Sequence, residues 1–330
     1  MHLLIATDEA GYGPKLGPLV ITATVWRVPS AQHRIESFAN FSVPLADPRC
    51  GKVIIDDSKK VFKRGQRLAS GQEPLLDVVC RAASTWASIP NPIRSFPSWL
   101  QTVAPLDFDS VANTPWFVDC LKAGGVESSS MTGNSPDQAL IDHWSANGLE
   151  LHDLSTRMIT ARAFNSLVDR GMNKADILTD STCELVGAFL AKHGESATEV
   201  SVFSDRHGGR AYYGAALQHR FPDSRMRVLH EDKNNSCYEL APTPSCGRIE
   251  WSFTVSGDSY PPVAMSSMIA KWLRERAMTE FNRYFQLRVP TGITLPVTAG
   301  YPTDADRFID DLARLSMREG IPDAMLIRQR

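Results

Sequence analysis

The chain has no long apolar run, few cysteines and no strong net charge, and each of these absences excludes a class of protein. Its 330 residues carry a formal charge of −2, so any nucleic-acid binding needs local basic patches. No apolar stretch approaches the roughly 20 residues that a membrane-spanning helix needs. The apolar run before Asp8 is too short for a signal peptide. We therefore expect a cytoplasmic protein.

Two further absences narrow the possible functions. The six cysteines show neither a CxxC spacing nor the density of a disulfide framework, so we expect free thiols in a reducing compartment. The sequence also lacks a GxxxxGK[ST] phosphate loop and a second copy of any acid-bearing strand. This argues against a phosphotransferase built from repeated nucleotide-binding domains. With 43% hydrophobic residues, the chain can still bury a full core, as one large domain or two smaller ones.

What the sequence does have is an acid pair at the start of a glycine-rich turn. Residues 8–18 read Asp-Glu-Ala-Gly-Tyr-Gly-Pro-Lys-Leu-Gly-Pro between two apolar runs, which predicts a strand, a tight turn and a second strand. Two adjacent carboxylates at the end of a buried strand are costly without a cation. Glycines let a ligand approach bare N–H groups. The pattern favours a metal and phosphate site, although plain solvated turns have the same composition.

Two more acids, Asp205 and Asp258, come at the ends of β-rich runs. In α/β sheets, ligand sites form where strand ends converge, so these two are expected to meet Asp8 and Glu9 in one cleft. Four carboxylates without histidine or cysteine suit Mg²⁺ or Mn²⁺. Such a set can hold two ions about 4 Å apart for phosphodiester hydrolysis. Taken alone, either Asp205 or Asp258 is as easily explained as a turn residue.

The remaining periodicities predict a mixed α/β body. The predicted helices cover residues 73–86, 154–170, 182–193 and 265–281, with Lys271, Arg274 and Arg276 largely off the apolar face of the last. The further predicted strands are residues 51–55 and 199–204 and a hairpin of 226–229 with 249–255. Residues 88–148 are rich in Pro, Ser, Asn and Gly and predict a loop-rich insertion, packed on the body through Trp99, Trp116 and Trp144.

Four ordered segments together resemble the ribonuclease HII (type 2 ribonuclease H) family. They are ATDEAGYGPKLGPLVITA at 6–23, DDSKKVFKRGQR at 56–67, VSGDSYPPVAMSSMIAKWLRERAM at 255–278 and GYPTDADRFIDDL at 300–312. The resemblance implies a ribonuclease-H-like domain over 1–330, with a mixed five-stranded sheet and helices on both sides. The loop-rich insertion at about 88–148 interrupts this domain, and a helical C-terminal extension covers about 262–330.

The resemblance also implies roles for the acids. Asp8, Glu9 and Asp258 stand where the family has metal-binding, catalytic carboxylates. Asp205 is the assignment for the fourth, although the family's acid is followed directly by glycine and here two residues intervene; Asp180 is the fallback candidate. The implied cofactor is Mg²⁺ or Mn²⁺. The implied reaction is hydrolysis of the RNA strand of RNA–DNA hybrids, or at ribonucleotides in DNA, leaving 3′-hydroxyl and 5′-phosphate ends.

The substrate-binding residues implied in the same way are Gly11, Tyr12, Gly13, Lys59, Lys60 and Tyr301. Tyr12 stands where the family has an arginine, in a loop that reads the ribose 2′-hydroxyl largely through its backbone. A tyrosine removes the cation but can stack or donate through its hydroxyl. The basic run over 59–67 either contacts phosphates or is a solvated face. His207, beside Asp205, is either a proton-transfer group or a surface histidine.

Two functions of different classes follow from these observations. The first is a metal-dependent endonuclease. The second is a non-catalytic nucleic-acid-binding protein of the same fold, which binds hybrids with a salt-dependent affinity and shows no turnover. We expect nucleic acid as the partner and no membrane association. A monomer is the expected state, although the sequence does not determine oligomerisation.

Overall fold

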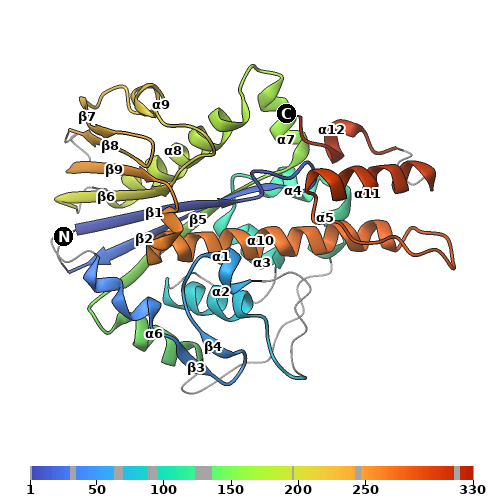
Figure 1. Ribbon diagram of the computed structural model, residues 1–330, viewed down its shortest axis with the longest axis horizontal. Helices are drawn as coiled ribbons and strands as arrows, with labels where there is room; N and C mark the ends of the chain where they lie inside the picture. The colour runs from blue at the N-terminus through green and yellow to red at the C-terminus, as the bar shows by residue number, and fades with distance from the viewer. Residues whose placement is uncertain are drawn as a thin grey trace.

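The computed structural model describes residues 2–29, 35–62, 70–87, 89, 96–122, 136–194, 197–241, 247–315 and 320–329. Its centre is a seven-stranded mixed sheet in the order β5-β2-β1-β6-β9-β8-β7 (Figure 1). The strands are β1 (His2–Ala10), β2 (Leu19–Val28), β5 (Glu150–Ile159), β6 (Glu199–Asp205), β7 (Met226–Glu231), β8 (Asn235–Leu240) and β9 (Arg248–Thr254). The predicted fold class, a mixed sheet flanked by helices, is confirmed.

The direction of the central strands places the acids at one edge of the sheet. β1 pairs antiparallel with β2 and parallel with β6, and β6 pairs parallel with β9. Since β1, β6 and β9 run in the same direction, their carboxyl ends meet. Asp8 and Glu9 lie near the end of β1, and Asp205 is the last residue of β6. The topology therefore joins acids that are far apart in the sequence.

The sheet is larger than the five strands predicted. β8, which the sequence analysis missed, pairs antiparallel with both β7 and β9. The hairpin predicted between 226–229 and 249–255 is therefore wrong, because β7 turns back into β8 instead. The segment reads Asn-Ser-Cys-Tyr-Glu-Leu and looks polar, yet Cys237, Tyr238 and Leu240 are buried. The strand was missed because it has too few apolar residues to show a regular period.

The helix predicted over 154–170 is also wrong in its first part. Leu154 and Met158 are four residues apart, which fits one face of a helix, but Thr156 between them is buried as well. Burial at every second residue is the period of a strand, and these residues belong to β5. The helix α7 (Ala161–Val168) begins only after Thr160, whose hydroxyl accepts the N–H of Ala163 as an N-cap.

The insertion at 88–148 is more helical than predicted. Its described residues contain α3 (Phe96–Val103), α4 (Phe108–Ala112), α5 (Pro115–Lys122) and α6 (Pro136–Ser145). Pro115 and Pro136 are the first residues of their helices, where proline's missing N–H costs nothing. The composition that indicated loops therefore marks starts of short helices. The three tryptophans of this region are buried, as predicted.

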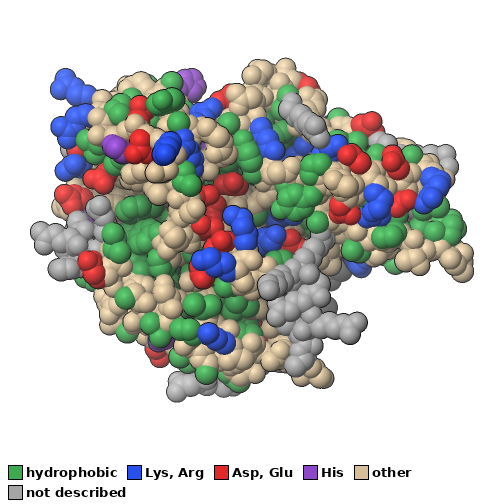
Figure 2. All heavy atoms as spheres, viewed as in Figure 1, with side chains coloured by type: hydrophobic (Ala, Val, Ile, Leu, Met, Phe, Trp, Pro, Cys, Tyr) green, Lys and Arg blue, Asp and Glu red, His purple; other side chains and the backbone are tan. Residues whose placement is uncertain are grey.

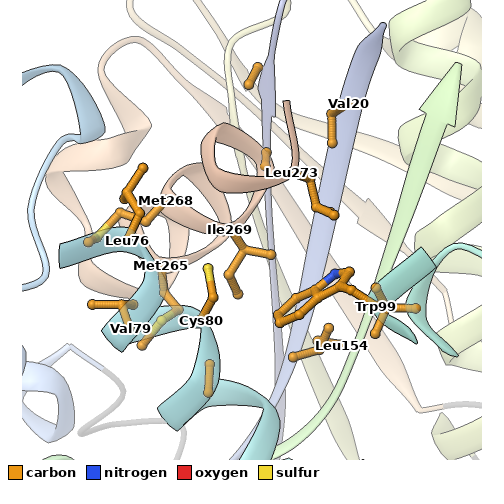
Figure 3. Packing of buried hydrophobic residues seen from close by; sticks show 14 of the residues in the cluster. Val20, Leu76, Val79, Cys80, Trp99, Leu154, Met265, Met268, Ile269 and Leu273 are labelled. Carbon is orange, nitrogen blue, oxygen red and sulfur yellow. The ribbon is translucent and has the colours of Figure 1, made fainter. Parts of the chain in front are cut away.

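Two hydrophobic cores cover the two faces of the sheet. Along β1, Leu4 and Ala6 face one cluster and Leu3 and Ile5 face the other. The first cluster includes α2 (Leu75–Trp86) and α10 (Pro261–Gln286), and the second includes α8 (Lys174–His193) and α9 (Gly214–Arg220). Figure 3 shows the α10 side chains packed between α2 and the sheet. Residues of α10 are therefore part of the main core. The predicted limits of the insertion at 88–148 and of the C-terminal extension at 262–330 stay a prediction.

Short elements complete the described chain. They are η1 (Glu36–Ser42), β3 (Leu45–Asp47), β4 (Gly51–Val53), α1 (Ser58–Val61), η3 (Gly257–Ser259), α11 (Pro302–Arg314) and α12 (Asp323–Leu326). Five cysteines of the described residues are free thiols. Among the helices described, none is both long enough and apolar enough to cross a bilayer.

Candidate metal centre and nucleic-acid interface

The carboxylates of Asp8, Glu9 and Asp205 form one cluster at the carboxyl edge of the sheet. One oxygen of each lies within 4.8 Å of the others. One residue before the acids, the hydroxyl of Thr7 on β1 donates to that of Ser204 on β6 at 2.7 Å, which ties the two strand ends together. The structure thus brings together three of the four predicted metal ligands.

Asp258 adjoins this cluster on η3, just beyond the end of β9. The N–H of Gly257 donates to Asp205 Oδ1 at 2.7 Å. A Cβ at Gly257 would lie 2.9 Å from the Cα of Asp205, so only glycine permits this approach. Asp258 is buried, and Lys59 Nζ lies 3.8 Å from its carboxylate. The fourth predicted acid is therefore held next to the other three by a glycine contact.

Burial, together with the charges of neighbouring acids, raises the pKa values in the cluster. Burial, followed by the charges of Glu9 and Asp205, raises the pKa of Asp8 well above its usual range. Burial and the charge of Asp205 raise the pKa of Glu9 to about 8. Burial and neighbouring charges raise the pKa of Asp258 to about 6, against the opposing effect of Lys59. The cluster carries more negative charge than its surroundings neutralise, so a divalent cation fits these residues.

The donor set of this cluster consists of carboxylate oxygens. Oxygen ligands favour Mg²⁺ or Mn²⁺ over zinc. His207 is not part of this cluster, and its Nδ1 and Nε2 lie 3.0 Å and 3.4 Å from the hydroxyls of Thr179 and Thr182. Burial lowers the pKa of His207 to about 3. The interpretation of His207 as a surface histidine is wrong, because its side chain is buried, and its low pKa makes the ring neutral at neutral pH.

Asp180, the fallback acid, lies elsewhere. It is an exposed residue in the middle of α8 rather than a cap. The cap of that helix is Asn173, whose side chain accepts from Ala175 and Asp176. Among the residues described, Asp205 and not Asp180 shares a cluster with Asp8 and Glu9.

The glycine turn, residues 11–17, joins β1 to β2. Gly11 and Gly17 have φ of +89° and +80°, a conformation that favours glycine. A Cβ at Gly11 would lie 2.5 Å from Arg274 Nε, and one at Gly17 would overlap the sulfur of Met278. Gly13 is exposed, and a Cβ at this position would lie 3.6 Å from the Tyr301 ring. Two of the three glycines therefore serve the turn itself, and Gly13 presents backbone to solvent.

Tyr12 and Tyr301 flank this turn. Tyr12 is half-buried against Gly208, where a Cβ would lie 2.8 Å from the tyrosine hydroxyl. Lys174 Nζ lies 4.3 Å from the centroid of the Tyr12 ring, a cation–π contact. Tyr301 is 48% exposed. The predicted substrate-binding residues of both segments thus lie side by side.

The predicted phosphate-binding lysines lie on α1, which Asp57 caps. Both are exposed, but they differ in their partners: Lys59 faces Asp258, and Lys60 Nζ lies 3.0 Å from Asp56 Oδ1. Residues 63–67 of the basic run lie outside the described residues. Figure 2 shows acidic and basic side chains next to each other at the centre of the face that α1 and the start of α10 occupy in Figure 1.

Sequence analysis missed two buried arginines beneath the glycine turn, Arg274 and Arg328. They are 1% and 3% exposed. The expectation that Arg274 lies off the apolar face of its helix is wrong. Arg274 lies four residues from Ala270 and from Met278, both buried, so the helical period carried a signal for its burial. No such signal marks Arg328 near the end of the chain.

Comparisons with known proteins find similarity in structure only. No family model and no curated protein matches the chain. A chain of the PCNA:RNase HII complex from Archaeoglobus fulgidus matches with 13% identity and a TM-score of 0.42, over 99% of this chain and 94% of that one. Ribonuclease H2 of Pyrococcus horikoshii OT3 matches with 13% identity and a TM-score of 0.43, over 98% and 92%. Bst-RNase HIII in complex with Mn²⁺ matches with 12% identity and a TM-score of 0.44, over 99% of this chain and 65% of that one.

Proposed function

We propose that this chain is a divalent-metal-dependent endonuclease that hydrolyses the RNA strand of RNA–DNA hybrids, or cuts at ribonucleotides in DNA. The observation that carries the proposal is the carboxylate cluster of Asp8, Glu9 and Asp205 with Asp258 beside it. The ends of β1 and β6 contribute three of these acids and η3 contributes Asp258, and burial followed by neighbouring negative charge raises the pKa values of Asp8, Glu9 and Asp258. The four motifs that resemble ribonuclease HII include Asp8, Glu9 and Asp258 and support the same function.

Asp8, Glu9, Asp205 and Asp258 would hold Mg²⁺ or Mn²⁺. When bound, such ions supply an activated water and stabilise the charge that develops on the leaving oxygen of a phosphodiester. The products of this reaction are 3′-hydroxyl and 5′-phosphate ends.

The chain's own residues supply the binding of the nucleic acid. Lys59 lies beside the acids with its side chain 84% exposed, so it is available to a backbone phosphate. Exposed backbone at Gly13 and the exposed ring of Tyr301 lie together, where a sugar can pack and accept a hydrogen bond. Tyr12 lies in the same turn, half-buried against Gly208.

The test is cleavage of two substrates, an RNA–DNA hybrid and a duplex with one ribonucleotide, each with Mg²⁺, with Mn²⁺ and with chelator. We expect metal-dependent cuts that leave 5′-phosphate ends. Asp205→Asn should abolish cleavage, and its matched control Asp180→Asn, an exposed acid outside the cluster, should cleave like wild type. Absence of cleavage by wild-type protein with both metals would refute the proposal. Loss of activity in Asp180→Asn with retention in Asp205→Asn would overturn the assignment of the acids.

A second candidate function is hybrid binding without turnover, which Tyr12 in place of the family's arginine favours. Binding by fluorescence anisotropy at several salt concentrations distinguishes the two. This alternative predicts affinity that falls with salt and no product at any metal concentration.

A further inference from the structure

The last described residues of the chain, 324–329, run along the glycine turn. Ile327 forms an isolated antiparallel bridge with Leu16. The N–H of Arg328 donates to the carbonyl of Lys15 at 2.9 Å. We call residues 324–329 the terminal segment. It is therefore paired, backbone to backbone, with the loop that carries Tyr12 and Gly13.

The Arg328 side chain continues this contact beneath the turn. Its Nη2 donates to the carbonyl of Gly11 at 2.5 Å and also to that of Pro14. The guanidinium lies 5.3 Å from the centroid of the Phe164 ring. One planar group thus holds two carbonyls, one on each side of Tyr12 and Gly13, and points both of them into the protein.

Burial of the Arg328 guanidinium costs stability that an apolar side chain at this position would not cost. Arg328 is 3% exposed, and its Nε and Nη1 have no hydrogen-bond partner among the described residues. Burial and the charge of Arg274 lower the pKa of Arg328 to about 9. A buried charge held by carbonyl dipoles is destabilising relative to an apolar side chain of similar size.

The terminal segment is itself fixed by α7. The side-chain amide of Asn165 donates to the carbonyls of Ala324 at 2.9 Å and of Ile327 at 2.7 Å. Its oxygen accepts the N–H of Gln329 at 2.8 Å. Asn165 is 2% exposed, so these bonds are shielded from water. The backbone on both sides of Arg328 is therefore hydrogen-bonded to Asn165 of α7.

We propose that Arg328 is a positioning residue that fixes the glycine turn in the conformation that receives the nucleic acid. Its bonds to Gly11 and Pro14 turn their carbonyls inward and leave Gly13 at the surface beside Tyr301. The residue acts through the turn and does not touch the acids. The inference rests on the proposed function, since it assigns the turn to substrate binding.

The experiment compares wild type with Arg328→Met, which keeps the apolar stem, and Arg328→Lys, which keeps the charge. Gln329→Ala is the matched control, because Gln329 lies in the same segment but its side chain bonds to Asp169 instead of the turn. Hydrogen exchange of the amides of residues 11–17 reports the turn directly. Hybrid cleavage reports kcat/KM, and calorimetry with Mn²⁺ reports the metal site.

We expect Arg328→Met to speed exchange in residues 11–17 by at least tenfold and to lower kcat/KM by roughly 100-fold, the cost of a misplaced binding element. Mn²⁺ affinity should match wild type, and Arg328→Lys should recover part of both losses. Exchange and kcat/KM in Arg328→Met that equal those of Gln329→Ala would overturn the inference. If Arg328→Met does not fold, wild-type behaviour of Arg328→Lys in both measurements has the same meaning. A wild-type protein that cuts no hybrid refutes the proposed function, while the exchange comparison still decides whether Arg328 holds the turn.

Discussion

The carboxylate cluster and the glycine turn adjoin each other at the carboxyl end of β1, and they differ in how their polar groups are paired. The cluster consists of Asp8, Glu9 and Asp205, and the pKa values of all three carboxyl groups are raised. In the turn, the carbonyls of Gly11 and Pro14 are bonded to Arg328, and that of Leu16 to Arg274. The polar groups of the turn are thus paired within the chain itself, whereas the cluster is the proposed site of an added cation. We therefore expect the cluster to respond to metal and the turn not to respond.

The largest effect is expected when one acid of the cluster is neutralised. Asp8→Asn keeps an oxygen for the N–H of Glu9 but removes one metal-binding charge. We expect hybrid cleavage to fall by about 1,000-fold or more, as one metal ligand is lost where charge develops in the transition state. Without metal, the variant should be more stable than wild type, because a repulsive buried charge is gone. Full activity in Asp8→Asn would contradict the metal-centre assignment.

The pH dependence of stability sharpens the same contrast. The pKa of Glu9 is about 8 in the folded protein and has an ordinary value of 4.5, so the folded state holds a proton that the unfolded state releases between these values. The protonated Glu9 side chain therefore contributes stability to the metal-free protein that is fully present below about pH 4.5 and is lost as the pH rises toward 8, at up to about 1.4 kcal/mol per pH unit for one proton. Urea unfolding in chelator measures the slope. The difference in free energy of unfolding between wild type and Glu9→Gln should fall as the pH rises over this range, and a difference that does not change with pH would disprove the assignment.

The turn should respond to substitution and not to metal. Gly17→Ala places a Cβ at φ +80° against Met278, and we expect a loss of about 2 kcal/mol in the free energy of unfolding, equal with and without Mg²⁺. Gly13→Ala is the control, since its Cβ meets only Tyr301 at ordinary contact distance. It should change stability by less than about 0.5 kcal/mol and instead weaken hybrid binding. Equal losses in both variants would show that the turn is not held as described.

The smallest effect is expected at Tyr12. Tyr12→Arg restores the residue that the family has between the glycines and adds a cation at the turn. We expect preference for a single ribonucleotide over an all-RNA strand to rise about 10-fold, the worth of one charge-assisted hydrogen bond. Tyr12→Phe keeps the ring and controls for packing against Gly208. The ratio of kcat/KM values on the two substrates measures this preference, and an unchanged ratio in Tyr12→Arg would show that position 12 does not read the sugar.

Local patterns in the sequence were sufficient to predict elements that a short segment specifies by itself. The strand–turn–strand at the N-terminus and the long helix α10 follow from apolar runs, glycines and a helical period. Patterns failed where the apolar spacing fits both a helix and a strand, or where an element has few apolar residues. Leu154 and Met158 fit both a helix and a strand, and β8 is too polar to be recognised. In both cases pairing with neighbouring strands decided the outcome.

The sequence by itself determined the acids, the glycine turn and the mixed α/β class, because these depend on residue type and on periods of two to four residues. Only the tertiary structure decided which acids meet, since parallel pairing of β1 with β6 sets Thr7 opposite Ser204 and Gly257 against Asp205. It alone also decided the place of Arg328, 317 residues from the Gly11 carbonyl that it holds. Contacts at such separations depend on how the whole chain packs, and no local pattern encodes them.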